Sequence, residues 1–200
     1  MDNVSRDLTA LPVLTPLDRS GLLEVARDSI GYGLRLGKPL PVDPGAYAQT
    51  LRAKGATFVT LRIKGSLRGC VGSLEAFRPI VTDVAHHAYG AAFRDPRFSG
   101  LTAGELDVVT CHISLLSRPQ PVSCDSEEHL LTQLRPGVDG LVLERGSNRG
   151  TFLPSVWSLI PQADQFLAQL KAKAGLRPDE WPSDIKVSRY EVEEIEKEAT

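Results

Sequence analysis

The stretch of the chain most suited to chemistry is Leu67-Arg68-Gly69-Cys70-Val71-Gly72-Ser73-Leu74, which places a thiol between two glycines and near an arginine. Glycine lets a backbone adopt positive φ and present bare N–H groups to a ligand. A nearby guanidinium stabilises a thiolate, the reactive form of cysteine. The pattern predicts a functional loop centred on Cys70. A glycine bulge that merely packs Cys70 in the core is an alternative of equal weight.

The geometry of the strand decides whether Arg68 can act on Cys70. In a regular strand Arg68, Cys70 and Gly72 project from the same face. A bulge would change that arrangement, so both geometries stay open at this point.

Histidines and the other cysteines are weaker candidates. His86 and His87 are adjacent on a predicted helix, so they point about 100° apart and cannot chelate one ion well. Because this helix closely follows the cysteine stretch, His87 is a candidate partner for Cys70, against a surface or core histidine as the simpler interpretation. Cys111 and His112 point to opposite faces of a predicted strand, with Cys111 on its core face. No recognised ligand spacing is present, and we predict no metal site.

Local patterns predict a mixture of helices and turn-connected strands, an α+β fold rather than a parallel doubly wound one. The helices begin at Asp18 or Ser20, at Pro79, at Glu127 after a Ser126 cap, and at Asp164, with Gly37 and Gly175 closing the first and the last. Thr102 and Glu105 have capping-box spacing. The strands are expected at 57–63, 67–74, 107–116, 140–145, 151–153 and 185–192, with a turn at 64–65 and a five-residue hairpin loop at 146–150.

Composition excludes several classes of protein. The 200 residues are 42% hydrophobic and 24% charged, enough for a sizeable core. A net charge of −2 argues against bulk coating of nucleic acid. No apolar run approaches a membrane span or a signal peptide, and three unpaired cysteines fit a reducing compartment. We therefore expect a cytoplasmic protein without membrane contact.

Several segments, in order, resemble the AMMECR1 family. Residues 67–72 resemble its Leu-Arg-Gly-Cys-Ile-Gly hallmark, with Val71 as a mild departure. Further similar segments are Ala91-Ala92-Phe93-Arg94-Asp95-Pro96-Arg97-Phe98, Ile113-Ser114-Leu115-Leu116-Ser117-Arg118-Pro119, Gly137-Val138-Asp139-Gly140-Leu141-Val142-Leu143, Thr151-Phe152-Leu153-Pro154-Ser155-Val156 and Lys173-Ala174-Gly175-Leu176 followed by Trp181.

The resemblance implies an antiparallel-rich sheet flanked by helices, in two packed lobes with a cleft. We expect an irregular arm over 1–15, a single AMMECR1-like domain over 16–195 and an acidic tail over 196–200, with Glu191–Glu198 as a solvated face or frayed end. The resemblance also implies two partner proteins, namely a Memo-like protein related to class III extradiol dioxygenases and a radical-SAM protein. Stand-alone members of that set are called AmmeMemoRadiSam system protein A.

The family's activity is not established, so function is a hypothesis built on the site. The leading one is an enzyme component acting on a small or nucleotide-like substrate, such as a nucleic-acid base to be modified. Cys70, Arg68 and His87 would be catalytic, and Gly69, Gly72, Asp95 and Arg97 would bind the ligand. A bidentate Asp95–Arg97 pair that only orders its loop is the favoured alternative for those two residues. The rival functions are a non-catalytic ligand- or RNA-binding module and a protein-interaction adaptor. No cofactor motif is present.

Overall fold

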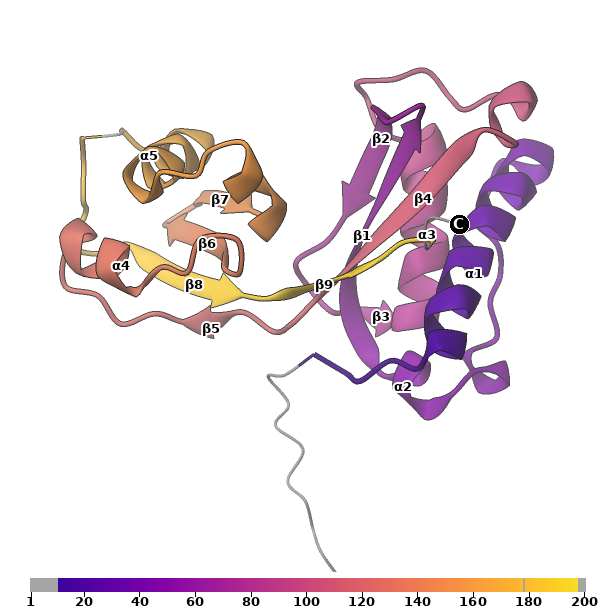
Figure 1. Cartoon of the computed structure of the whole chain (residues 1–200), viewed down its shortest axis with the longest axis horizontal. Coiled ribbons are helices and arrows are strands. Elements are labelled where there is room, and N and C mark those ends of the chain that lie inside the picture. The colour runs from indigo at the N-terminus through magenta and orange to yellow at the C-terminus, as the bar shows by residue number, and fades with distance from the viewer. Residues whose placement is uncertain (1–10, 178, 198–200) are drawn as a thin grey trace, which may run out of the picture. The chain divides into compact units, whose positions relative to one another are not determined.

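The computed structural model describes residues 11–177 and 179–197. Within the predicted domain the chain forms two compact units (Figure 1). The first unit is built from Pro12–Leu116 and from the residues that follow Val192, and the second is built from Ser117–Val192. Each contains helices and an antiparallel sheet, which confirms the predicted α+β class.

The first unit combines a five-stranded sheet with two long helices. The sheet runs in the order β2-β1-β4-β9, and β3 pairs with β1. Its elements are α1 Pro16–Leu36, η1 Pro44–Ala46, α2 Gln49–Arg52, β1 Lys54–Ile63, β2 Ser66–Gly72, β3 Arg78–Pro79, α3 Ile80–Phe93, η2 Ala103–Glu105, β4 Val109–Leu116 and β9 Val192–Ile195.

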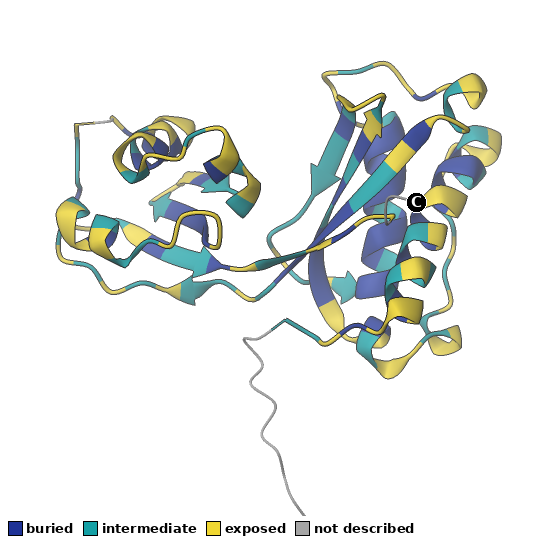
Figure 2. Ribbon diagram, viewed as in Figure 1, coloured by how far each residue is buried: buried dark blue, intermediate teal, exposed yellow. Residues whose placement is uncertain are grey.

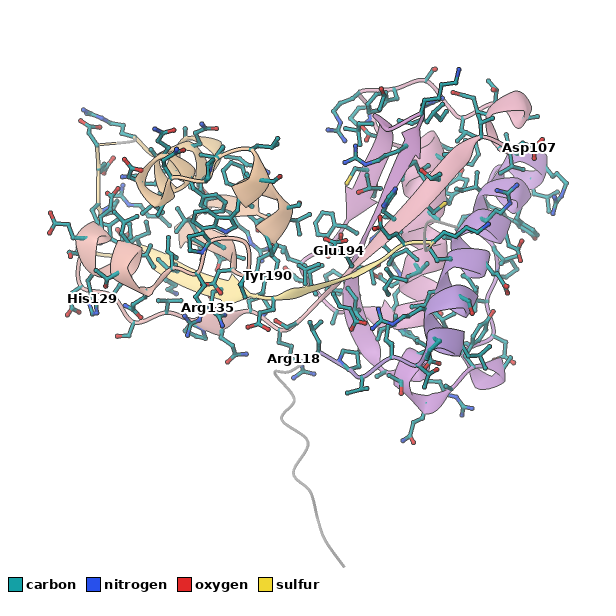
Figure 3. The ribbon with its side chains drawn as sticks, in the orientation of Figure 1. Asp107, Arg118, His129, Arg135, Tyr190 and Glu194 are labelled. Carbon is teal, nitrogen blue, oxygen red and sulfur yellow. The ribbon has the colours of Figure 1, made fainter. Side chains whose placement is uncertain are left out.

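The second unit is built around a four-stranded sheet in the order β5-β8-β6-β7. Its elements are β5 Gln120–Pro121, α4 Glu127–Gln133, β6 Gly140–Arg145, β7 Asn148–Phe152, η3 Pro154–Ser158, α5 Ala163–Lys173 and β8 Lys186–Tyr190. Its core centres on Phe166, whose ring stacks on Trp157 with 3.7 Å between centroids. Tyr190, labelled in Figure 3, is almost fully buried, and burial raises its pKa to about 12 although its hydroxyl hydrogen-bonds with Thr151.

No helix in the described part of the chain is long and apolar enough to cross a membrane.

Short-range signals place most helix ends where the sequence predicts them. Gly37 closes α1 with φ of 65°, and Ser126 caps α4 by accepting a hydrogen bond from the His129 N–H. The predicted start of α1 is wrong by a few residues, because Thr15 is the N-cap and Asp18 completes its capping box from within the helix.

Three predictions about strands need correction. The hairpin between β6 and β7 has a two-residue turn rather than a five-residue loop, since Arg145 pairs with Asn148. The predicted strand over 185–192 is two strands, because β8 ends at Tyr190 and the chain then enters β9 of the other sheet. The segment expected to be a solvated or frayed end therefore contributes a strand with Ile195 buried, while residues 198–200 lie outside the described part.

The hairpin that carries Cys70 is regular at its turn and irregular just after it. Lys64 and Gly65 both have positive φ, as a two-residue type I′ turn requires. The register then shifts, because Leu61 pairs with Gly69 while Arg62 pairs with Leu67. Arg68 is thus the extra residue of a β-bulge, the geometry that breaks the shared face expected for Arg68 and Cys70.

Alternation along β1 separates the two faces of the first sheet. Thr57, Val59 and Leu61 are buried on the face covered by α3. In Figure 2 both β1 and α3 carry dark blue, buried stretches. Phe58 and Thr60 lie on the opposite face and are half-buried. Because directly paired residues share a face, Cys70 lies with Thr60 on this second face.

Packing explains both glycines of the cysteine strand. A Cβ on Gly69 would lie 2.0 Å from the carbonyl oxygen of Ala91 on α3, and one on Gly72 would lie 2.2 Å from the Phe58 ring. Neither glycine is among the described residues with positive φ, so the conformational reason given for them from sequence is wrong. They are glycines because β2 packs against α3 and against β1 without room for a side chain.

We expect Gly69→Ala to lower the free energy of unfolding by about 3 kcal/mol, because the obstructing atom belongs to helix backbone that cannot move aside. Gly21→Ala is the matched control, since nothing lies within 4 Å of a Cβ at that position of α1. Because Gly21→Ala replaces a glycine within a helix, it should raise the free energy of unfolding by up to about 1 kcal/mol. Urea unfolding curves measure both, and equal stability of Gly69→Ala and wild type would contradict the packing account.

Candidate functional site

Cys70 is held at its backbone and contacted at its sulfur. Its N–H donates a hydrogen bond of 2.8 Å to Asp95 Oδ2, and its half-buried Sγ accepts one of 3.3 Å from Thr60 Oγ1. The thiol therefore lies at the surface of the sheet rather than within the helix-facing core.

Asp95 is a buried carboxylate that organises the loop after α3. It accepts from Arg97 Nε at 3.0 Å, Arg97 Nη2 at 2.7 Å and the Arg97 N–H at 3.1 Å, so the bidentate pair expected from sequence is present. These bonds, with that from Cys70, hold the pKa of Asp95 well below its usual range against the opposing effect of burial. One carboxylate thus positions both the cysteine strand and an arginine.

Arg97 brings positive charge to the neighbourhood of the thiol. Its side chain is 55% exposed, and its pKa is raised chiefly by the hydrogen bonds to Asp95, with a smaller contribution from the charge of Cys70. A guanidinium has five N–H donors, of which Asp95 engages only part. Arg97 is therefore anchored and still has donors to offer a ligand.

Arg68 donates hydrogen bonds to residues other than Cys70. Its Nε and Nη2 donate to the two carboxylate oxygens of Glu105 at 2.7 and 3.1 Å, and it also donates to the carbonyl oxygens of Ser99 and Gly100. The Arg68 guanidinium lowers the pKa of Glu105 to about 2. The sequence-based pairing of Arg68 with Cys70 is not formed, because the bulge directs Arg68 towards η2.

His87 lies under the sheet rather than beside Cys70. Its Nδ1 is 3.1 Å from Thr57 Oγ1 and 3.1 Å from Asp83 Oδ2, and both of those residues are fully buried. Asp83 also accepts from Arg78 at 2.9 Å. Since Thr57 and Cys70 are on opposite faces of the sheet, the structure does not bring His87 and Cys70 together.

The remaining cysteines have different surroundings. Cys111 pairs with Leu61 on the helix-facing side of β4, and burial raises its pKa to about 11. Cys124 packs against the core of the second unit, and burial also raises its pKa. Neither thiol has a reason to ionise at neutral pH.

Three side chains near Cys70 were not singled out from sequence as part of the site. Thr60 faces Cys70 on one neighbouring strand and His112 on the other, and Glu196 contacts His112. The alternation of β4 had placed His112 away from the core, but the register that aligns it with Thr60 is a long-range property. No group of three or more His, Cys, Asp and Glu side chains among the described residues is arranged to hold a metal ion.

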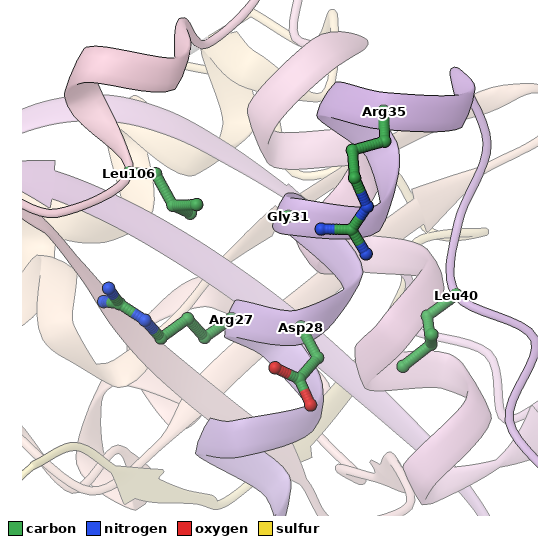
Figure 4. A pocket seen from close by; sticks show the side chains of 6 residues that line it. All are labelled: Arg27, Asp28, Gly31, Arg35, Leu40 and Leu106. Carbon is green, nitrogen blue, oxygen red and sulfur yellow. The ribbon is translucent and has the colours of Figure 1, made fainter.

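A separate hollow lies on the helical side of the first unit, over Gly31 of α1 (Figure 4). Gly31 leaves its floor open, with the nearest atoms to an added Cβ 3.8 Å away on Arg35 and Leu106. It contains none of the residues predicted to be functional, and no cysteine or histidine lines it. Its lining residues are Arg27, Asp28, Gly31, Arg35, Leu40 and Leu106.

These features define an α+β protein of two sheet-containing units, with a bulged cysteine strand packed on a helix. The model of the AMMECR1 family matches residues 23–195, and the chain belongs to this family. A protein of Methanothermobacter thermautotrophicus is 38% identical over 161 residues, covering 79% of this chain and 82% of its own. The crystal structure of uncharacterized protein PH0010 from Pyrococcus horikoshii is similar with a TM-score of 0.78 and 33% identity, covering 88% of this chain and 90% of that one.

The Arg68–Glu105 pair should make stability depend on acidity. Glu105→Gln removes the charge but keeps a residue that serves the Thr102 capping box, so we expect a loss of about 1 kcal/mol at pH 7. Because pairing lowers the pKa of Glu105 from 4.5 to about 2, its contribution is complete above pH 4.5 and disappears as the pH falls towards 2.

Urea unfolding of wild type and Glu105→Gln at several pH values measures this difference. Glu24→Gln, which changes an exposed carboxylate on α1, should have an effect within about 0.5 kcal/mol throughout. A Glu105→Gln difference that persists unchanged at pH 2 would be inconsistent with an ion pair.

Proposed function

We propose that this chain is the thiol-bearing component of an enzyme system that acts on a small or nucleotide-like substrate, with Cys70 as its reactive group. The observation that carries the proposal is the hydrogen bond of 3.3 Å from Thr60 Oγ1 to Cys70 Sγ on the face of the sheet away from α3. A thiol that only fills space needs no hydroxyl donor and packs among apolar side chains, as Cys111 does beside Leu61.

Arg97 supports an anionic substrate. Its guanidinium is exposed, fixed in direction by Asp95 and electrostatically coupled to the thiol. Such a group recognises phosphate or carboxylate by bidentate hydrogen bonding. Arg97 is therefore better placed to hold an anion than Arg68, whose guanidinium is engaged by Glu105 and two carbonyl groups.

The proposed partners are a Memo-like protein and a radical-SAM protein. The support is membership of the AMMECR1 family, whose resemblance implies such partners. Such partners would supply the redox or metal chemistry that the thiol of this chain lacks. In that arrangement this chain binds the substrate and contributes a nucleophile.

Site-resolved alkylation by iodoacetamide, followed by mass spectrometry across pH, tests the reactive thiol. We expect Cys70 to be alkylated at pH 7.5 at least tenfold faster than Cys111, whose pKa of about 11 leaves it almost wholly protonated. Thr60→Val should slow alkylation of Cys70 by removing the donor to its sulfur.

Thr110→Val is the matched control, because Thr110 lies on β4 and its hydroxyl donates to the carbonyl oxygen of Arg62 rather than to sulfur. It should leave the alkylation of Cys70 unchanged. If native Cys70 were as inert as Cys111, the thiol would be structural and the proposed chemistry would be wrong.

Anion recognition by Arg97 is tested with nucleoside monophosphates and inorganic phosphate. At a concentration ten times the dissociation constant, a bound nucleotide should raise the melting temperature by about 3 °C. Arg97→Gln should abolish this shift relative to its own unliganded melting temperature. Arg94→Gln, which changes a neighbouring exposed arginine, should retain it. An undiminished shift in Arg97→Gln would place the anion elsewhere.

A further inference from the structure

A row of three polar side chains crosses three adjacent strands of the first sheet, β2, β1 and β4. Thr60 of β1 is paired directly with Cys70 of β2 on one side and with His112 of β4 on the other. Directly opposed residues of antiparallel strands project from the same face. Cys70, Thr60 and His112 therefore share the face away from α3, with the threonine in the middle.

A carboxylate holds the imidazole at the end of this row. His112 Nδ1 lies 2.7 Å from Glu196 Oε2, just beyond the end of β9. Since a carboxylate accepts hydrogen bonds, this contact puts a proton on Nδ1 and orients the ring. Nε2 is then the nitrogen left to exchange a proton with a ligand, and the side chain is 30% exposed.

A second carboxyl lies beside the first. Glu194, labelled in Figure 3, accepts a hydrogen bond of 2.8 Å from Ser114 Oγ, two residues along β4 from His112. Burial raises the pKa of Glu194, while the Ser114 hydrogen bond and the charge of His112 act in the opposite direction. β9 and the residue after it thus bring two carboxyl groups to β4, Glu196 against His112 and Glu194 against Ser114.

The distance between Cys70 and His112 determines how the two side chains can act on one substrate. Neighbouring strands are about 4.8 Å apart, so the backbones of Cys70 and His112 are separated by about 10 Å. The thiol and the imidazole therefore do not form a direct ion pair across Thr60. A substrate group lying over Thr60 would instead have Cys70 on one side and His112 on the other.

We propose that His112, oriented by Glu196, is the proton donor of the Cys70 site for an anionic substrate with an electrophilic acyl carbon. The inference rests on the proposed function, since it needs Cys70 as the nucleophile. The Cys70 thiolate forms the S–C bond, the bond from carbon to an oxygen or nitrogen leaving group breaks, and the leaving atom takes the proton from His112 Nε2. Solvent then returns a proton to the imidazole. Arg97, which shares the Asp95 carboxylate with the Cys70 N–H, holds the anionic group of the substrate.

The position of Glu196 makes it a positioning residue, because it acts through His112 and not on the substrate. Thr60 lies under the reacting group and donates to the sulfur. His87, which the sequence offered as a candidate partner of Cys70, is excluded from this role because it lies beneath the opposite face.

Two half-esters of succinate test His112, because they differ only in leaving group. The nitrophenyl ester has a leaving group that departs without a proton, whereas the ethyl ester needs a donor. Acylation of Cys70 in the intact protein is followed by mass spectrometry. We expect His112→Gln to slow acylation by the ethyl ester at least tenfold and acylation by the nitrophenyl ester less than twofold. Glu196→Gln should show the same selectivity with a smaller loss.

The controls separate this inference from the proposed function. His129→Gln, on α4 of the second unit, should change neither rate. Equal losses on both esters would show that His112 is structural, and no loss on either would show that it is not used. If wild-type Cys70 is alkylated rapidly but acylated by neither ester, the acid–base proposal is wrong while the thiol stands. If wild-type Cys70 is not alkylated, the proposed function itself is wrong.

Discussion

The site depends on the buried carboxylate of Asp95. This one side chain accepts from the Cys70 N–H on β2 and from the Arg97 guanidinium in the loop after α3. A buried carboxylate requires such donors, since an unpaired charge in the interior is strongly unfavourable. Satisfying Asp95 therefore holds the cysteine strand and the Arg97 guanidinium against one carboxylate.

A steric constraint acts together with this electrostatic one. Gly69 allows β2 to reach the carbonyl oxygen of Ala91, so strand and helix meet at a distance that no other residue permits. The bulge at Arg68 lies immediately before this contact and turns the arginine towards Glu105. The hallmark segment thus serves mainly to pack β2 against α3. As a result, Cys70 projects from the opposite face of the sheet.

The two faces of the first sheet carry different sets of polar side chains. On the helix-facing side, Thr57, Asp83 and His87 form a buried hydrogen-bonded network. On the opposite side, Cys70, Thr60 and His112 lie in line, and β9 adds carboxylates beside them. The last described strand of the chain is therefore part of the candidate site, although the acidic composition of that segment is typical of a solvated end.

Much of the local structure follows from the sequence alone, because it depends on residues only a few positions apart. The Lys64-Gly65 turn, the Gly37 and Ser126 caps, the Thr102–Glu105 capping box and the Asp95–Arg97 pair are of this kind. The mixture of helical patterns and turn-connected strands also predicts the α+β class, and the glycines and arginine around Cys70 single out that residue. Tertiary structure alone decided the rest. A register shift directs Arg68 to Glu105, and strand pairing puts His112, rather than the candidate His87, on the face of the sheet that carries Cys70. The return of the chain after the second unit adds β9 to the first sheet. These outcomes depend on contacts between distant segments, and a strand's own pattern of residues does not encode which neighbour it meets or in what register.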